Sequence, residues 1–496
     1  MKNGFYISAY CAIDEEGCAL NAQIRHDQSI ALWRLTNNRV DLVKYWELER
    51  ITRQKQHMRP FLNLEHFEIF LKELLSEVNV SIDQINEIWG MPEYQQLDWS
   101  NMLSYYKLPI HSLFHIFSSL INTEKQFTNF NLVLALDGGP DNVLDDGFDL
   151  PNHYAAAIFD KGNLVSIEPI SSPAYFWAEA SDRFRMREGT LMALAEACSC
   201  EMKICADHPI YGVTRFNSMW DIQKYRGAFD ELWKEIVDAP LEMDIRFNEN
   251  ENRVSAFMKI LQEISKRMIS NEVLRLVNKY KLPVYNTILS IVGGFALNCP
   301  TNTWLMEQFN FADFVAPPCV NDAGISLGIG LMSFYSRLKD KLCFALDSPY
   351  YGSTDRWERF PIIYNQYISS ISEFDIDTFI EDISQYPVCW FEGESEIGPR
   401  ALGHRSILSS ATTIEMKNLL NQIKQREWWR PVAPIILSDV LKEWCDPSIE
   451  SPYMLHAVKI KEEKLDFVPA VLHLNNSARI QSVKAPSMMH CILNKY

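Results

Sequence analysis

The alternation of apolar and polar positions near the start of the chain predicts a β-rich opening segment. Residues 30–35 and 39–43 have the pattern of two strands, and the polar residues 36–38 between them suit a tight turn. The spacing then becomes helical over residues 66–78, where the apolar side chains recur on one face of a helix. Residues 88–90 have the pattern of a short strand and turn. This mixture predicts an α/β fold.

Further along, an apolar strand is followed three times by a turn of small residues. These units are residues 132–136 before 137–139, residues 288–292 before 293–294, and residues 314–316 before 321–324. Repetition of this unit predicts a duplicated α/β fold with a nucleotide in its cleft. From residue 348 the chain becomes polar and rich in turn residues. We therefore expect one domain over residues 1–347 and a smaller α/β domain over residues 348–496.

Composition narrows the function without identifying it. Hydrophobic residues make up 47% of the 496 residues and charged residues 22%, as in folded globular proteins. A net charge of −17 argues against an extended nucleic-acid surface. The eleven cysteines have no regular spacing, the first residues lack the apolar core of a signal peptide, and no apolar run is long enough to span a membrane. We expect a soluble, cytoplasmic protein with reduced thiols and no membrane partner.

Two histidines and two aspartates are candidates for a metal site. His111 and His115 are four residues apart, so on a helix they would share one face. Asp137 and Asp322 each follow a predicted strand and have glycine nearby. Together the four would suit iron or zinc, with positions left open for a phosphate or substrate oxygen. Taken alone, however, a histidine pair at this spacing is more often an ordinary core or surface feature.

Glycines at two strand ends are candidates for nucleotide binding. Gly138 and Gly139 would let phosphates approach the backbone, although Asp-Gly sequences are also common in simple turns. Gly293 and Gly294 would lie under an adenosine, with Asn298 reaching toward it. The alternative for this second pair is close packing of a helix on a strand, and the residues alone do not decide between the two.

A basic stretch interrupts this acidic chain. Residues 400–430 contain six Lys or Arg and only two Glu. Such a local excess suits an anion site, because guanidinium groups bind phosphates bidentately. The alternative is a solvated helix face whose charge is partly neutralised by the two glutamates.

Taken in order, these pieces resemble the NodU/CmcH-type O-carbamoyltransferases. The segments that carry the resemblance are GPRALGHRS at 398–406, KQREWWRPVAP at 424–434, IVGGFALNCPTN at 291–302, NDAGISLGIG at 321–330, HDQS at 26–29, WELERITRQKQH at 46–57, GTLMALA at 189–195, SPYM at 451–454 and PAVLHLNNSARIQSV at 469–483. That family joins an ASKHA-type domain, similar to the tRNA threonylcarbamoyl transferases, to a YrdC-like domain.

The resemblance implies a reaction in two steps. The YrdC-like domain would combine carbamoyl phosphate with Mg-ATP to give carbamoyl adenylate and pyrophosphate. The phosphates there would be held by Arg400, Lys424, Arg426, Arg430 and Arg479. In the ASKHA-like domain a metal, Fe(II) or alternatively zinc, would be held by His111, His115, Asp137 and Asp322. His26, oriented by Asp27, would deprotonate the hydroxyl of a small natural product that accepts the carbamoyl group.

The sequence departs from the family pattern in three places. Residues 10–25 look like an insertion before His26, which would reshape the acceptor pocket or move that histidine. Residues 196–200 replace a glycine-rich stretch. The expected TGxPxLLNTSFN-like segment does not follow residue 483. We therefore expect a short YrdC-like domain that is incomplete, unusually closed, or completed by a homodimer or another partner. The alternatives are a homologue that depends on a partner for adenylate and a non-catalytic nucleotide-binding protein.

Overall fold

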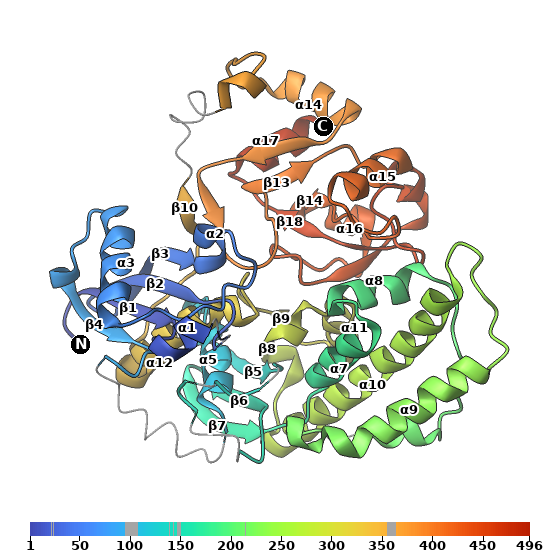
Figure 1. Cartoon of the computed structure of the whole chain (residues 1–496), viewed down its shortest axis with the longest axis horizontal. Helices are drawn as coiled ribbons and strands as arrows, with labels where there is room; N and C mark the ends of the chain where they lie inside the picture. Colours follow the sequence, from blue (N-terminus) through green and yellow to red (C-terminus); the bar gives the residue numbers. More distant parts are fainter. Residues whose placement is uncertain are drawn as a thin grey trace. The chain divides into compact units, whose positions relative to one another are not determined.

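The chain forms two compact units in a computed structural model (Figure 1). Unit 1 comprises Met1–Ser348 and Ile397–Pro399, and unit 2 comprises Pro349–Glu396 and Arg400–Tyr496. The structure describes residues 1–20, 22, 24–94, 108–137, 139–141, 143–145, 150–213, 215–354 and 364–496. The division after Ser348 lies next to the boundary expected from the sequence. Both units mix helices with sheets, which confirms the α/β class.

The first sheet of unit 1 has the strand order β3-β2-β1-β4. Its strands are β1 (Gly4–Tyr10), β2 (Ser29–Thr36), β3 (Arg39–Glu47) and β4 (Ile85–Trp89). The hairpin expected around residues 36–38 is confirmed, because β2 and β3 pair antiparallel up to Thr36 and Arg39. The helix α3 (Leu64–Ser76) buries Phe67, Leu71 and two further leucines, as the helical spacing predicted. Short helices α1 (Glu15–Leu20) and α2 (Leu48–Thr52) follow β1 and β3.

The second sheet of unit 1 repeats this pattern of pairing. Its order is β7-β6-β5-β8-β9, formed by β5 (Phe130–Ala135), β6 (Ala155–Asp160), β7 (Asn163–Pro169), β8 (Thr287–Val292) and β9 (Asp313–Phe314). In both sheets the first strand pairs antiparallel with the second and parallel with the fourth. All three strand-and-turn units found in the sequence lie in this second sheet, and the third contributes a strand of only two residues.

Two buried helices connect the sheets of unit 1. Helix α12 (Ile325–Leu338) packs on β1 and β2, helix α5 (Ile110–Ser118) packs on β5 and β6, and the two helices contact each other. All nine residues of α5 are buried, and so are residues 325–335 of α12. A Cβ atom on Gly328 of α12 would lie 1.9 Å from the carbonyl oxygen of Phe114 in α5. Only glycine permits this close approach of the two helices.

The remaining helices of unit 1 form a separate group around the long helix α10. They are α7 (Ala174–Phe184), α8 (Glu188–Ala197), α9 (Ile222–Asp238), α10 (Glu249–Tyr280) and α11 (Cys299–Phe309), while the short α6 (Thr123–Gln126) precedes β5. Helix α10 contacts α8, α9 and α11. No helix among the described residues is long and apolar enough to cross a membrane. All eleven cysteines are free thiols.

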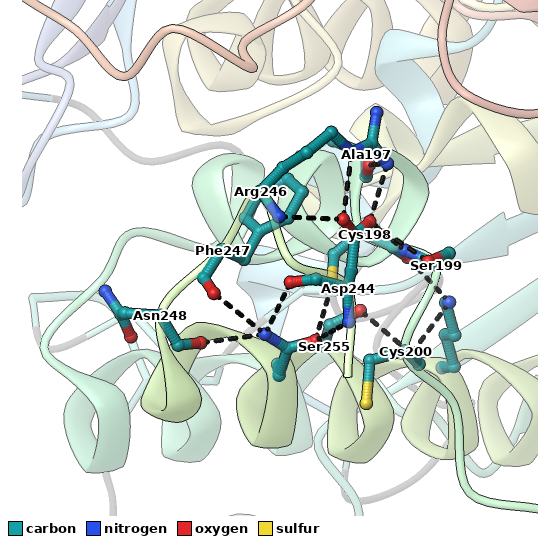
Figure 2. Close-up of polar contacts among 11 residues, drawn as sticks. Ala197, Cys198, Ser199, Cys200, Asp244, Arg246, Phe247, Asn248 and Ser255 are labelled. Atoms are coloured by element: carbon teal, nitrogen blue, oxygen red, sulfur yellow. Dashed lines mark hydrogen bonds and ion pairs between the residues drawn. The ribbon is translucent and has the colours of Figure 1, made fainter. Parts of the chain in front are cut away.

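A dense polar junction ties α8 to the start of α10, and we call it the Asp244 junction (Figure 2). Its residues are Cys198, Ser199, Cys200, Asp244, Arg246, Asn252 and Lys259. The Asp244 carboxylate accepts bonds from Ser199 N at 2.9 Å, Ser199 Oγ at 3.0 Å and Arg246 Nε at 2.9 Å. Asn252 Nδ2 donates to three backbone carbonyls, and Asn252 Oδ1 accepts from Asp244 N at 2.7 Å. Lys259 Nζ donates to the carbonyls of Cys198 and Cys200.

Unit 2 is built from several small sheets. Its strands are β10 (Tyr350–Thr354), β11 (Val388–Phe391), β12 (Glu394–Glu396), β13 (Arg405–Leu408), β14 (Ile435–Leu437), β15 (Cys445–Asp446), β16 (Ala457–Ile460), β17 (Ser477–Arg479) and β18 (Gln481–Val483). They pair as β10-β12, β11-β13, β14-β18 and β15-β16-β17. The helices are α14 (Ile376–Gln385), α15 (Ile414–Ile423), α16 (Leu441–Trp444) and α17 (Met488–Lys495). Two apolar clusters form its core, one around Val458 and Ala478 and the other around Phe379 and Trp390.

Candidate metal centre and anion site

Helix α5 places His111 and His115 side by side, as their spacing predicted. The two imidazole rings have centroids 4.8 Å apart and are almost perpendicular, at 85°. Both side chains are buried, at 3% and 0% exposed. Because the surrounding residues of α5 are apolar, the two imidazoles are the main polar groups that this helix directs into the unit.

Asp137 follows β5 and is oriented by the neighbouring loop after β8. Gly294 N donates to Asp137 Oδ1 at 2.8 Å, and Asp137 Oδ2 lies 3.2 Å from His111 Nε2. Gly293 has a φ of 91°, and a Cβ there would lie 2.5 Å from the carbonyl oxygen of Leu136. The glycine pair therefore permits close packing of the two loops and directs a backbone N–H at the carboxylate.

Asp322 stands at the start of α12, in the short 3-10 helix η6 (Asp322–Gly324). Buried hydroxyl groups fix this helix to the first sheet. Ser8 Oγ donates to Ser326 O at 2.6 Å, and Ser326 Oγ donates to Ser29 O at 2.6 Å. The Gly328 contact with α5 then brings Asp322 toward the two histidines.

The four residues predicted as metal ligands meet in one cluster. One ligand atom from each of His111, His115, Asp137 and Asp322 lies within 4.8 Å of all the others. His115 Nε2 is 3.3 Å from Asp322 Oδ1 and 3.7 Å from Asp137 Oδ2. Within the described part of the chain, both Nδ1 atoms and His115 Nε2 are buried without a hydrogen-bond partner. Two imidazoles and two carboxylates are a donor set that fits Fe(II) or Zn²⁺.

The charges of the cluster depend on one another. Burial lowers the pKa of His111, but the Asp322 and Asp137 carboxylates outweigh it and raise the pKa well above its ordinary value. The pKa of His115 is also raised, because burial lowers it less than the Asp137 and Asp322 carboxylates raise it. Without a cation, the cluster therefore forms ion pairs among its own members. A divalent cation would instead bind the neutral imidazoles and both carboxylates.

His26 and Asp27 lie beside this cluster. His26 Nδ1 is 2.9 Å from Asp27 Oδ2, and His26 Nε2 is 3.3 Å from Asp322 Oδ2. The His26 side chain is 52% exposed, so one side of the ring is open to solvent. The Asp322 carboxylate is the main cause that raises the pKa of His26, to about 9, with burial opposing it and Asp27 adding to it. The structure thus brings this predicted pair next to the predicted metal ligands.

Among the residues predicted to bind a nucleotide in unit 1, Asn298 has a clear structural role. Asn298 is 1% exposed and accepts a hydrogen bond from Thr301 N at 3.2 Å, which caps the start of α11. Its Nδ2 donates to Gln262 Oε1 at 2.9 Å. A Cβ on Gly139 would meet only the sulfur of Met219, at 3.6 Å. Gly138 lies outside the described residues. A nucleotide at these glycines stays a prediction.

In unit 2, the predicted phosphate-binding side chains include four that influence one another's charge. They are Lys424, Arg426, Arg430 and Arg479. Burial, followed by Arg430 and Arg479, lowers the pKa of Arg426 to about 10. Burial, Arg426 and Arg479 also lower the pKa of Lys424. Because such mutual repulsion is relieved when an anion binds, this group suits a phosphate.

The segment of unit 2 that begins at Arg400 forms a loop ordered by a buried carboxylate. Glu396 Oε1 accepts from the backbone N–H groups of Leu402 at 2.5 Å and Arg405 at 3.2 Å. The Arg405 guanidinium donates to the carbonyl oxygens of Glu392 and Gly393 at 2.8 Å. Arg405 therefore supports the loop, while Arg400 is half-buried on the same loop. A phosphate contact for Arg400 stays a prediction.

Sequence reasoning missed a buried ion pair whose residues are close in the sequence to His26 and Asp137. Arg25, at the end of the predicted insertion, forms a fully buried ion pair with Asp141. Asp141 lies two residues beyond the predicted turn of residues 137–139, but nothing in the sequence linked it to Arg25. A charged residue directly before His26 was the available signal. Part of the insertion is helix α1.

Comparison with known proteins gives this geometry a family context. Residues 383–496 match the model of the carbamoyltransferase C-terminus. The chain is 37% identical to nodulation protein U of Sinorhizobium fredii over 222 residues, which cover 45% of this chain and 38% of that protein. It is 31% identical to the 3'-hydroxymethylcephem-O-carbamoyltransferase of Streptomyces clavuligerus over 211 residues, 40% of this chain and 37% of that protein.

A third match is weaker in identity but covers more of the chain. An uncharacterized protein of Methanocaldococcus jannaschii is 26% identical over 463 residues, 88% of this chain and 83% of that protein. By contrast, the matches to nodulation protein U span only about two fifths of that protein's length. The C-terminal match and these relatives agree with the resemblance found in the sequence. The chain therefore contains the C-terminal domain of the carbamoyltransferases and is similar to NodU/CmcH-type proteins over about two fifths of its length.

Proposed function

We propose that the protein is an ATP-dependent O-carbamoyltransferase. It would take the carbamoyl group of carbamoyl phosphate, form carbamoyl adenylate, and transfer the group to a hydroxyl of a small natural product. The observation that carries the proposal is the gathering of His111, His115, Asp137 and Asp322 in one buried cluster beside His26. A protein that only bound nucleotides would have no use for such a cluster.

The cluster supports the transfer step in unit 1. A cation bound by its four side chains would supply Lewis-acid charge for an adenylate phosphate. The chain's own residues prepare that site. Gly294 N holds Asp137 Oδ1 in place, and the hydroxyl network of Ser8 and Ser326 fixes the start of the helix behind Asp322. Unpartnered imidazole nitrogens leave the histidines ready to donate lone pairs to Fe(II) or, as an alternative, Zn²⁺.

His26 is the candidate for moving the acceptor proton. Its ring is open on one side and is held by Asp27 at Nδ1, which would fix the ring orientation and leave Nε2 toward the cluster. An acceptor hydroxyl would therefore have to reach Nε2, between His26 and the cluster. The fold supports this placement, since the two sheets with similar pairing and the two helices between them are consistent with a duplicated ASKHA-type domain.

The basic group of unit 2 supports the adenylation step. Lys424, Arg426, Arg430 and Arg479 would bind the phosphates of Mg-ATP and carbamoyl phosphate, joined by Arg400. Water would first cleave the O–P bond of carbamoyl phosphate, which releases inorganic phosphate and leaves carbamate. A carbamate oxygen would then bond to the α-phosphorus of ATP, and pyrophosphate would leave. Guanidinium groups would neutralise the charge that develops on the phosphates. These roles are consistent with a YrdC-like domain.

The first test is pyrophosphate release by the full chain given ATP, Mg²⁺ and carbamoyl phosphate. We expect release that requires carbamoyl phosphate, is lost in Arg400→Ala, and is retained in the surface control Lys459→Ala. Asp322→Asn should still release pyrophosphate but accumulate carbamoyl adenylate, detectable by mass spectrometry, because its change lies in the transfer unit.

One outcome would favour a different reaction for this chain. If folded, metal-binding protein releases no pyrophosphate, adenylation does not occur in this chain alone. Added carbamoyl adenylate would then distinguish a transferase supplied by a partner from a non-catalytic homologue. Consumption of the added adenylate, lost in Asp322→Asn, would identify the transferase.

A further inference from the structure

A fully buried arginine lies directly before His26. Arg25 is 1% exposed, and its guanidinium donates from Nε to Asp141 Oδ1 at 3.0 Å and from Nη2 to Asp141 Oδ2 at 2.5 Å. The remaining nitrogen, Nη1, donates to the carbonyls of Cys11 and Gly90. Its Cζ also lies 4.7 Å from the centre of the Tyr10 ring. Every nitrogen of this guanidinium is therefore engaged inside the protein.

The ion pair continues as a chain of hydrogen bonds. The backbone N–H of Asp141 donates to Asp145 Oδ2 at 2.8 Å. The other oxygen of the same carboxylate, Asp145 Oδ1, accepts from Ile110 N at 2.7 Å. Ile110 is the first residue of helix α5. A continuous polar path thus runs from Arg25 through Asp141 and Asp145 to the start of α5.

Each end of this path adjoins a residue of the candidate metal centre. Arg25 precedes His26, and Ile110 precedes His111. Asp141 is four residues beyond Asp137 in the same loop. The path therefore connects the three backbone segments that carry His26, Asp137 and His111. The same three segments also meet directly in the candidate metal cluster, through the ion pairs of His26 and His111 with Asp322 and of His111 with Asp137.

The energetic character of the path argues against a merely stabilising role. A buried ion pair is costly to desolvate and is often no better for stability than apolar residues of the same volume. Its specific contribution is directional, because a bidentate guanidinium and carboxylate fix both distance and angle. Bonds of this kind behind metal ligands hold those ligands in the required orientation.

We propose that Arg25, Asp141 and Asp145 are positioning residues that set the distance between His26 and the metal ligands. We call these three residues the Arg25 brace. The inference rests on the proposed function for the presence of a metal. The brace itself is a property of the apo chain, so one of its tests needs neither metal nor activity.

The first measurement is Co²⁺ binding, followed by titration against a chelator and by the visible spectrum. Arg25→Lys keeps the charge but loses the bidentate fork, and we expect its Co²⁺ affinity to fall 10- to 100-fold. Asp145→Asn, which keeps one acceptor oxygen, should show a smaller loss. Asp244→Asn is the matched control, because it removes a carboxylate that binds an arginine in the Asp244 junction, away from these ligands. It should leave Co²⁺ affinity unchanged.

A second variant removes the ion pair without leaving an unpaired buried charge. It controls for the possibility that a single substitution lowers Co²⁺ affinity only because the protein misfolds. The double variant Arg25→Met, Asp141→Leu replaces both ions by apolar side chains and should fold. If this variant and Arg25→Lys fold and bind Co²⁺ within threefold of the natural chain, the brace has no positioning role and the proposal is overturned.

The second measurement separates this inference from the proposed function. Imidazole NMR signals of His26 and His111 in the apo protein should shift in Arg25→Lys, while those of His208, which pairs with Glu235 of α9, should not. If the natural chain binds no Co²⁺ but these signals shift, the metal assignment fails and the brace stands. If the signals of His26 and His111 stay unchanged, the brace is overturned whatever the metal result.

Discussion

Two buried polar clusters of unit 1 differ in how completely their atoms are bonded. In the Asp244 junction, the carboxylate, the Asn252 amide and the Lys259 ammonium each bond to partners within the protein (Figure 2). In the metal cluster, both Nδ1 atoms and His115 Nε2 have no hydrogen-bond partner within the described residues. Buried polar atoms that lack partners cost free energy, so a fold retains them where a ligand completes the bonding.

The number of buried polar atoms that lack hydrogen-bond partners distinguishes a structural cluster from a binding cluster more clearly than the types of residue do. Both clusters contain carboxylates and are largely inaccessible to solvent. The junction closes its bonds between chain segments and therefore stabilises the start of α10. The candidate metal cluster forms ion pairs only among its own members and leaves imidazole nitrogens without hydrogen-bond partners in the described part of the chain, so a cation could still bind there.

Asp322 gives the strongest test of the difference between the two clusters. Replacing it with asparagine removes a charged ligand, so we expect metal affinity to fall by more than about 100-fold and carbamoyl transfer to be lost. The free energy of unfolding of the apo variant should lie within about 1 kcal/mol of the value for the natural chain, because we expect the cluster to contribute little to folding. Isothermal titration and thermal unfolding measure the two effects. Asp313→Asn on the half-buried β9 is the control, and an equal loss of metal affinity there would contradict the assignment.

Gly328 links helix packing to the metal cluster. Its replacement by alanine would place a Cβ against the Phe114 carbonyl, so we expect a loss of about 3 kcal/mol in the free energy of unfolding. Metal affinity should fall with it, by about tenfold, because α5 and α12 carry ligands and would be pushed apart. Chemical denaturation and metal titration measure both quantities.

The control for that prediction is Gly227, on helix α9. A Cβ there has no atom within 4 Å, so alanine should raise the free energy of unfolding by about 0.5–1 kcal/mol. If Gly227→Ala and Gly328→Ala change stability equally, the close contact of α5 and α12 is not what the glycine permits.

Asn252 is the matching test of the Asp244 junction. Alanine in its place leaves three carbonyls and one backbone N–H without their partner, so we expect a loss of about 2–3 kcal/mol in the free energy of unfolding. Metal affinity should not change, because this cluster is bonded independently of any ligand. A parallel loss of metal affinity would show that the two clusters are coupled.

Asp244 gives the comparison a pH dependence. Bonds from Arg246, then Ser199, lower the pKa of Asp244 below its ordinary value of 3.8, although burial opposes them. The charged form therefore stabilises the folded protein above about pH 4, and this stabilisation is lost as the pH falls toward the folded-state pKa. Relative to Asp244→Asn, the natural chain should be more stable by about 1–2 kcal/mol at pH 7. Urea unfolding should show that difference shrinking below about pH 4.

Local patterns in the sequence were enough to predict much of the candidate site. The four-residue spacing of His111 and His115 works because a helix brings such positions onto one face. Asp137 was found because a carboxylate after an apolar strand lies at the edge of a sheet. These are short-range relations, and the structure places both sets together as expected.

Long-range relations were not predictable from the chain alone. The bond between Arg25 and Asp141 joins residues 116 positions apart, and no local pattern encodes that pairing. The sequence predicts that Asn298 faces a ligand, which stays a prediction, but it did not reveal that this side chain caps α11 and bonds to Gln262, because that pairing depends on where α10 packs. The similarity of the two sheets likewise emerges only from strand pairing, not from the spacing of the strand-and-turn units.

The contact of α5 with α12 has a consequence for the order of events during synthesis. The helix with His111 leaves the ribosome roughly 200 residues before the aspartate at the start of α12. At 5–20 residues per second, roughly 10 to 40 s pass before both are present. During that interval the nascent chain carries two histidines and lacks the carboxylate that completes their set. A cation that needs all four side chains would therefore bind only to a chain that has already been translated through the start of α12.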